Sequence, residues 1–348
     1  IAKPLPELQD ETNSGQGLTI TNYLELDGVI DLVGESQLVQ TEGSILDEDS
    51  GGYIIRHQQG TANGFNYNYW SSSVGPVGID TGSPTGISST NADYTIKDVL
   101  KDGTNAASYP YPDITFNPSY SAADSSTPNW PRTISSYWMY KFYGPASDYY
   151  SWEKIDENTP LGAGEGFTMK GTSGASALTN QQNYAFVGKP NNGDFTLALN
   201  KLPGDVNRLI GNPYPSAMDA TEFILDNMSV ADGGNNPTGN VINGAVYFWD
   251  HYGQTDSHYL GDYVGGYATY NLTGGTPAIT QNWASYAKSS APPIPPFGET
   301  PGQYIPVNQG FFVSTGIDGF QDGNGVPLVS VAGGDIVFKN SQRAFVTE

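Results

Sequence analysis

Apolar and polar residues alternate along much of the chain, and this period of two predicts β-strands. The pattern begins at Leu18 in LTITNYLEL and continues in VIDLVG. Further strands are predicted at 53–57, 65–70, 136–143, 166–170, 184–187, 194–199, 207–211, 245–250, 266–271, 310–314 and 335–339. Sustained helical periodicity is nearly missing. The one helix predicted covers Ala220 to Asn227, with Asp219 as its N-cap and with Phe223 and Ile224 facing inward. The pattern therefore predicts an all-β fold with little helix.

Several short phrases occur twice, in the same order and with unequal loops between them. The matched pairs are 32–36 with 209–213, 137–144 with 246–253, 163–167 with 307–311, and 193–195 with 334–336. Without long helices to cover parallel strands, the repeat predicts two related antiparallel β-sandwich-like units with long polar loops. We expect a tail or linker and first strand in 1–28, one unit in 29–203 and a second in 204–348.

Composition narrows the choice of partners. With 36 acidic and 14 basic residues, the net charge is −22, which disfavours nucleic acid and anionic membranes as partners. The chain has no cysteine, so disulfides cannot stabilise it, and no apolar run approaches the ~20 residues of a transmembrane segment. The 43 glycines, 24 prolines and 23 tyrosines are typical of an extracellular β protein with polar loops.

One glycine-rich stretch brings oxygen ligands together. Asp318, Asp322 and Asn324 are spaced as a calcium-binding turn requires, so calcium is the one cofactor that the sequence suggests. The stretch lacks the glutamate at the twelfth position of a helix-loop-helix calcium site. An ordinary acidic β-turn explains it equally well.

The densest group of histidines and carboxylates lies between Asp250 and Asp262. It contains His251 and His258, whose side chains together with aspartate would suit a transition metal. Their spacing matches no short zinc motif, and we interpret this stretch as a polar hairpin loop.

Signals of catalysis are weak. The chain has no cysteine, no G-x-S-x-G elbow and no histidine beside a persuasive serine. Glu153 and Glu165 are conceivable as the carboxylate pair of a glycoside hydrolase. However, Glu165 aligns with Gln309 in the other copy, which favours a turn of the framework. We therefore expect no enzymatic activity.

Tryptophans offer the best candidates for ligand contact, because flat aromatic rings can stack on sugars. Trp138 and Trp249 lie in the repeated strand and are expected in the core. Trp130, Trp152 and Trp283 lie in loop-like sequence and are the candidate ligand-binding residues. The alternative is that these rings also pack inside, as most aromatic rings do.

A set of longer phrases resembles a family of large secreted proteins of Bacteroidota, especially flavobacteria. These phrases are LIGNPYPSAMD from Leu209, YWSS from Tyr69, GEGFTMKG from Gly164, FVGKPNNGD from Phe186 and VFKNSQRAF from Val337. The resemblance covers about residues 28–348 and implies cargo of the type IX secretion system, located at the cell surface or outside the cell. Family members usually carry a signal peptide and a C-terminal sorting domain. Neither is in this sequence, which we therefore expect to be part of a longer protein.

The sequence and the resemblance together predict a non-enzymatic surface protein that serves as an adhesive, binding or assembly module. A subunit of a surface filament is one version, in which the N-terminal segment or an exposed edge strand joins neighbouring copies by strand addition. The expected partners are other copies of the chain, or surface glycans and proteins. The alternative is a carbohydrate-binding accessory region of a secreted polysaccharide-degrading enzyme.

Overall fold

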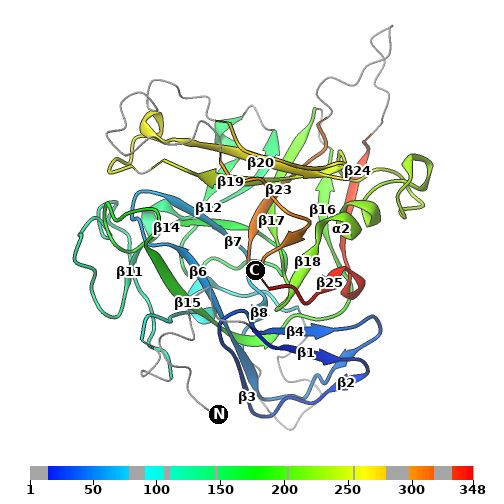
Figure 1. Ribbon diagram of the computed structural model, residues 1–348, viewed down its shortest axis with the longest axis horizontal. Coiled ribbons are helices and arrows are strands. Elements are labelled where there is room, and N and C mark those ends of the chain that lie inside the picture. Colours follow the sequence, from blue (N-terminus) through cyan, green and yellow to red (C-terminus); the bar gives the residue numbers. More distant parts are fainter. Residues whose placement is uncertain are drawn as a thin grey trace, which may run out of the picture.

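The fold is described by a computed structural model, which covers residues 15–77, 91–105, 110–145, 148–201, 204–253, 255–279, 298–316 and 331–347. Strands dominate it (Figure 1), and the predicted all-β fold with little helix is confirmed. The α-helices of this part of the chain are α1 (Ile96–Val99) and α2 (Ala220–Asp226). The predicted helix is therefore present as α2, and the Asp219 carboxylate accepts the backbone N–H groups of Thr221 and Glu222 at its start.

The N-terminal strands form two coils of a parallel β-solenoid, at the bottom of Figure 1. The first coil contains β1 (Gly17–Ile20), β2 (Tyr23–Leu24) and β3 (Val29–Leu32). The second contains β4 (Gln37–Gln40), β5 (Ile45–Leu46) and β6 (Tyr53–Thr61). Each strand of the first coil pairs in parallel with its counterpart in the second. This arrangement differs from the antiparallel pairing that the sequence predicted, because alternation in short strands does not set their direction.

The largest sheet described is nine-stranded and takes strands from both sides of residue 204. Its order is β21-β20-β19-β23-β17-β12-β14-β7, with β13 paired to β12. The strands are β7 (Tyr67–Trp70), β12 (Tyr140–Pro145), β13 (Trp152–Lys154), β14 (Phe167–Lys170), β17 (Val206–Gly211), β19 (Ala245–His251), β20 (Gly265–Asn271), β21 (Gly274–Thr276) and β23 (Gly310–Ser314). Strand pairing thus does not separate at the expected boundary between the two units.

Within this sheet, two groups of four strands have the same order. The order β13-β12-β14-β7 in the first half of the chain corresponds to β20-β19-β23-β17 in the second half. Phe167 faces Trp70 in the first group, and Phe311 faces Ile210 in the second. Tyr140 pairs with Thr168 in the first group, and Tyr247 pairs with Phe312 in the second. Tyr140 therefore corresponds to Tyr247 in the repeat. The sequence comparison had instead aligned Tyr140 with Trp249, so the repeat is shifted there.

The repeated turns before β14 and β23 each form hydrogen bonds with the other half of the chain. Glu165 forms an isolated bridge with Ile210, and its counterpart Gln309 forms one with Trp70. The Gly211 N–H donates to the Gly164 carbonyl, while the Ser71 N–H donates to the Asn308 carbonyl. Both acceptor residues have positive φ, +81° for Gly164 and +60° for Asn308. The repeated phrases are therefore the places where the two halves are joined.

The remaining strands flank this sheet. A five-stranded sheet has the order β3-β6-β15-β8 with β9 paired to β15, β16 pairs with β24, β10 pairs with β11, and β18 lies between β22 and β25. The strands not yet given are β8 (Val74–Gly75), β9 (Leu100–Asp102), β10 (Thr115–Asn117), β11 (Thr133–Ser135), β15 (Gln181–Pro190), β16 (Phe195–Asn200), β18 (Ala217–Asp219), β22 (Tyr304–Ile305), β24 (Gly333–Phe338) and β25 (Arg343–Ala344). One apolar core collects residues between Leu26 and Phe186, and another collects residues between Leu199 and Phe338.

Candidate functional site

A cavity of about 850 Å³ lies against the nine-stranded sheet and is walled mainly by aromatic rings. We call it the aromatic cavity. It is lined by Tyr67, Tyr69, Trp138, Tyr140, Tyr149, Trp152, Thr168, Trp249, His258, Tyr259, Leu260, Tyr263, Gly265, Gly266, Tyr267, Pro277 and Ile279. None of these lining residues is Asp, Glu, Lys or Arg. The volume is in the range of small-molecule sites.

Strand alternation brings these rings to one face of the sheet. Tyr67 and Tyr69 are two residues apart on β7 and therefore point the same way, and Tyr69 faces Thr168 on β14. On the other side, Trp249 of β19 faces Tyr267 of β20, and their ring centroids are 5.0 Å apart. The cavity is thus built on rigid strands from both halves of the chain.

Trp152 connects the cavity wall to the apolar cluster beneath it. Its ring lies 5.0 Å from Phe142 and 5.9 Å from Phe312, in edge-to-face contacts. It also meets Tyr69 at 6.4 Å between centroids. Such pairs stabilise a fixed ring orientation. The wall around Trp152 is therefore preorganised for contact with a flat or cyclic ligand.

A polar network closes one end of the cavity. The Lys170 amine donates to the phenolic oxygen of Tyr263 at 2.6 Å and to Nδ1 of His258 at 2.9 Å. His258 Nε2 donates in turn to the Asp124 carboxylate at 3.0 Å, and Tyr263 donates its hydroxyl hydrogen to the Phe65 carbonyl at 2.9 Å. The His258 ring is stacked on Trp138, with centroids 4.6 Å apart. Every member of this network therefore has a defined partner.

Burial determines the charge of these groups. Desolvation lowers the pKa of Lys170 to about 7, although the negative charge of Asp124 opposes the shift. Burial and then the nearby Lys170 lower the pKa of His258 below its usual value. The pKa of His251 falls to about 3, again mainly through burial and secondly through Lys170. At pH 7 the His258 imidazole at the end of the cavity is therefore neutral, and the Lys170 amine beside it is half-protonated.

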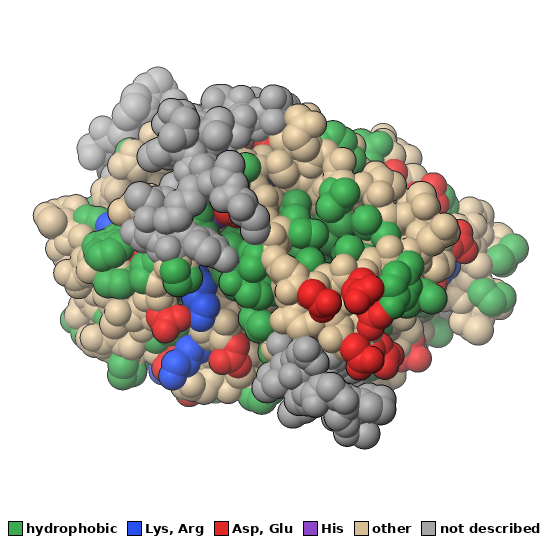
Figure 2. Space-filling view, turned by 90° about the horizontal axis from the view of Figure 1, so that it is seen from below, with side chains coloured by type: hydrophobic (Ala, Val, Ile, Leu, Met, Phe, Trp, Pro, Cys, Tyr) green, Lys and Arg blue, Asp and Glu red, His purple; other side chains and the backbone are tan. Residues whose placement is uncertain are grey.

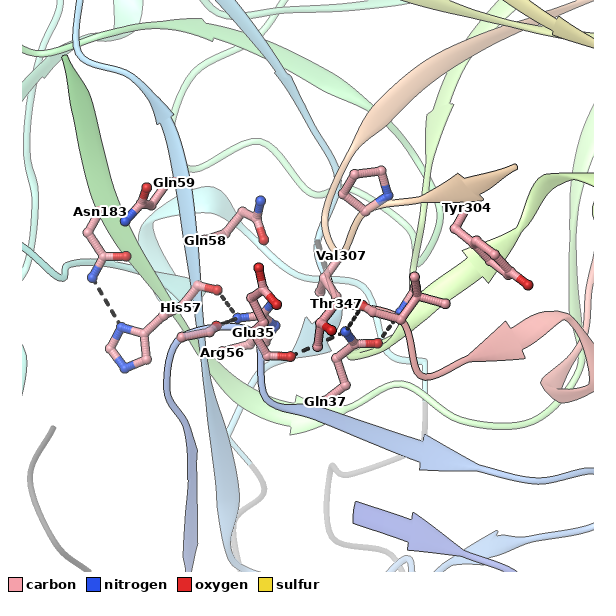
Figure 3. Close-up of a pocket in the computed structure, with 14 residues that line it drawn as sticks. Glu35, Gln37, Arg56, His57, Gln58, Gln59, Asn183, Tyr304, Val307 and Thr347 are labelled. Carbon is pink, nitrogen blue, oxygen red and sulfur yellow. Dashed lines mark hydrogen bonds between the residues drawn. The ribbon is translucent and has the colours of Figure 1, made fainter. Parts of the chain in front are cut away.

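A second, smaller cavity of about 160 Å³ lies between the solenoid coils and the C-terminal segment, and Figure 3 shows its polar lining. Arg56 is 5% exposed there and donates to the Gly34 carbonyl at 2.8 Å. His57 contacts Asp31 at 2.9 Å and Asn183 at 3.2 Å. The space equals that of about five water molecules. Because its polar groups mostly hold neighbouring segments together, we interpret this cavity as a structural junction.

The structure separates the tryptophans selected from the sequence. Trp152 lines the aromatic cavity, whereas Trp130 is 56% exposed and is not among the lining residues. Trp283 lies outside the described residues, as do Asp318, Asp322 and Asn324 of the suggested calcium turn. Trp138 and Trp249, which were expected in the core, are partly exposed and line the cavity instead. Alternation along β19 places Trp249 on the cavity face, whereas Trp138 ends a 3-10 helix (Ser136–Trp138) that precedes β12.

The other candidate residues from the sequence each contact different partners. Glu165 forms an ion pair with Arg208 at 2.5 Å, whereas Glu153 pairs with Lys141 at 3.4 Å on the surface. His251 ends strand β19, and its Nε2 accepts the Tyr67 backbone N–H at 3.3 Å. In the part of the chain that the structure describes, no group of three or more His, Asp or Glu side chains is arranged to hold a metal ion.

Sequence reasoning missed Lys170, Asp124 and Tyr263. Lys170 is 88 residues from His258 and 93 from Tyr263, and Asp124 is 134 from His258, so no local motif connects them. The available signal was a lysine within the strand GEGFTMKG, where an inward position is uncommon for a charged residue.

The chain belongs to the family described as "Domain of unknown function (DUF8693)", whose model matches residues 9–345. No curated protein and no solved structure matches the chain. Within the described residues, no helix is long and apolar enough to cross a bilayer.

Proposed function

We propose that the protein is a non-enzymatic extracellular binding module and that the aromatic cavity takes its ligand. The observation that carries this proposal is the cavity of about 850 Å³ with aromatic walls and without acidic or strongly basic lining residues. A large, mostly apolar cavity with a few convergent polar groups is the usual form of a ligand site. Tyrosine hydroxyls and Thr168 supply those polar groups here.

Neutral carbohydrate is the ligand class that fits these walls best. The apolar face of a sugar ring stacks on aromatic rings such as those of Trp152 and Trp249, while the hydroxyls meet tyrosine hydroxyls at the edges. The net charge of −22 disfavours an acidic polymer. Acidic side chains also outnumber basic ones on the face shown in Figure 2. The same site would serve either a surface adhesin or a carbohydrate-binding region of a polysaccharide-degrading enzyme.

Two neighbouring tyrosines provide a matched test of this site. Tyr149 is 69% exposed and lines the cavity, whereas Tyr150 is 91% exposed and does not. We expect Tyr149→Ala to weaken binding of cellotriose or chitotriose about tenfold, the loss of about 1.4 kcal/mol from one stacking contact. Tyr150→Ala should bind as the unchanged protein does. Titration followed by tryptophan fluorescence measures both, and equal effects of the two substitutions would contradict the proposal.

We also propose a location and an origin for the module. The resemblance to secreted flavobacterial proteins supports a place at the cell surface and export by the type IX system. The equal order of β13-β12-β14-β7 and β20-β19-β23-β17 supports an origin of the two halves as related β-sandwich-like units. The presence of separate apolar cores in the two halves supports the same view.

Assembly through the solenoid coil is a second candidate function. Among the described residues, β1 pairs only with β4, so its other edge has no strand beside it. The carbonyls of Gln16 and Ile20 point toward the second coil, where they accept the N–H groups of Gln37 and Thr41. By alternation, the N–H of Thr19 points to the open edge. A second copy could add a strand there, as the filament hypothesis requires.

The edge can be blocked without changing the pairing inside the chain. We expect Thr19→Pro to prevent self-assembly, because proline removes the outward N–H. Thr19→Val keeps that N–H and should assemble as the unchanged protein does. Sedimentation velocity and electron microscopy at rising protein concentration measure the result. Monodisperse monomers of the unchanged protein at high concentration would reject assembly through this edge.

A further inference from the structure

The Lys170 amine is set apart from the other described lysines by its surroundings. Its side chain is 1% exposed, and its Nζ lies 3.9 Å from the centroid of the Trp138 ring and 4.7 Å from that of Tyr67. No described carboxylate forms an ion pair with it. The amine is therefore held by π faces and neutral hydrogen-bond partners, which leave it a large neutral fraction near pH 7.

The groups next to this amine are arranged as those next to an activated nucleophile. His258 Nδ1 lies 2.9 Å from Nζ and has its lone pair toward it, because Nε2 carries the hydrogen donated to Asp124 at 3.0 Å. A nucleophile beside a base that a third group orients is the general pattern of covalent catalysis. Tyr263 contacts the amine on another side at 2.6 Å.

The amine also borders the aromatic cavity. Tyr67, Trp138, His258 and Tyr263 surround Nζ, and all four line the cavity. These side chains thus lie between the cavity and the amine. Trp138 is only partly buried, and its indole nitrogen donates to the Tyr120 carbonyl at 2.8 Å. Displacement of this ring would uncover Nζ, which lies 3.9 Å from its centroid.

We propose that Lys170 captures an aldehyde that enters the aromatic cavity, as an imine, with His258 as the base and Asp124 as the group that orients His258. This inference rests on the proposed function, because it requires the cavity to admit a ligand. The inference specifies the class of ligand as a small carbonyl compound with an aromatic or sugar-like body. The cavity walls alone do not specify this class.

The reaction balances without an oxidant or a reductant. The lone pair of Nζ attacks the carbonyl carbon, and the electrons of the C=O π bond move to oxygen, which takes up a proton from the solvent. His258 Nδ1 accepts a proton from the nitrogen and returns it to the hydroxyl group of the carbinolamine. The nitrogen lone pair then expels that group as water, and a C=N bond remains between Lys170 and the ligand.

Borohydride trapping tests the proposal on the complete chain. After incubation with 4-hydroxybenzaldehyde and borohydride at pH 7.5, we expect one adduct per chain, located on Lys170 by peptide mass spectrometry. Lys170→Met should lose this adduct. Lys154→Arg should keep it, although Lys154 also lies over an aromatic ring, that of Tyr137 at 4.1 Å. Trp138→Ala should raise the trapping rate severalfold, because it uncovers the amine.

A parallel titration with 4-hydroxybenzyl alcohol distinguishes ligand binding in the cavity from imine formation at Lys170. This alcohol has the shape of the aldehyde but cannot form an imine. If the alcohol binds and the aldehyde leaves no adduct on Lys170, or labels exposed lysines equally, Lys170 is a structural residue and the inference is overturned. If neither compound binds and no adduct forms, the cavity does not admit such ligands, and the inference fails together with this use of the cavity. Circular dichroism of Lys170→Met checks that the variant is folded.

Discussion

Acidification from pH 6.5 toward pH 3 should lower the free energy of unfolding by up to about 5 kcal/mol through His251 alone. The folded protein holds this imidazole neutral, with its pKa lowered to about 3 chiefly by burial. The unfolded chain has the ordinary pKa of 6.5 and takes up the proton first. The contribution of His251 is therefore complete above pH 6.5 and is lost as the pH falls toward 3.

His251 has little means of accepting a second proton in place. Its Nδ1 is buried without a hydrogen-bond partner, and its Nε2 already accepts the Tyr67 N–H at 3.3 Å. Its ring is also wedged between Trp249 and Tyr263, at 5.0 and 5.2 Å between centroids. The figure of about 5 kcal/mol follows from about 1.4 kcal/mol for each pKa unit. It is an upper bound, because the residue as a whole is partly exposed.

The substitution His251→Gln keeps an acceptor for Tyr67 and removes the titration. Urea denaturation at pH 7 and pH 4.5 measures both proteins. We expect the unchanged protein to lose about 2 to 3 kcal/mol more than the variant over this interval. Equal losses would show that His251 takes up its proton as easily in the folded state as in the unfolded one.

Asn212→Ala should destabilise the fold by about 4 kcal/mol, since several buried polar groups lose their partner at once. The side chain is fully buried, and its Nδ2 donates toward the carbonyls of Ser216, Ile305 and Pro306 at 2.8, 3.2 and 3.0 Å. Its Oδ1 accepts the Tyr214 N–H at 3.0 Å. One amide thus holds together the loop after β17 and the strand β22.

Asn158 provides a control for this substitution. It lies on an exposed turn, where its backbone N–H donates to Asp156 and its side-chain amide donates to Glu157. Asn158→Ala should change the free energy of unfolding by about 0.5 kcal/mol or less. Urea denaturation of both variants at pH 7 gives the comparison. A loss at Asn212 no larger than that at Asn158 would contradict a structural role for the amide.

Buried amides of this kind explain the phrases that carry the resemblance to secreted proteins. Asn191 in FVGKPNNGD donates to the carbonyls of Ser72 and Pro213, at 3.1 and 3.0 Å. Asn340 in VFKNSQRAF contacts Asn192 at 2.9 Å. Amide side chains pair the backbone groups of long loops that have no helix or sheet to satisfy them. The asparagines of these two phrases therefore stabilise the scaffold and do not line the aromatic cavity.

Much of the fold could be predicted because local signals determine single strands. The alternation around 166–170, 207–211 and 310–314 placed β14, β17 and β23, and Asp219 placed the start of α2. Partner choice is different, because it depends on residues far apart in the chain. The parallel coils of β1 to β6 and the sheet shared by both halves were therefore not predicted.

The candidate site was predicted only in part for the same reason. Trp152 was selected as an aromatic residue in loop-like sequence, and it lines the cavity. Trp249 was assigned to the core, because the pattern cannot say which face of a strand a cavity adjoins. Trp138 was assigned there as part of a predicted strand, but it lies in a 3-10 helix before that strand begins at Tyr140. Lys170 depends on His258 and Tyr263, which the fold brings to it from another part of the chain.

Crystallography tests whether the aromatic cavity is a ligand site for neutral carbohydrate. Crystals of the protein soaked in saturating cellotriose or chitotriose should show electron density for a sugar ring against Trp152, Trp249 and Tyr267. Tyr149 should lie within contact distance of the same ligand. An empty cavity under these conditions, or a sugar bound only elsewhere, such as at the exposed Trp130, would contradict the claim.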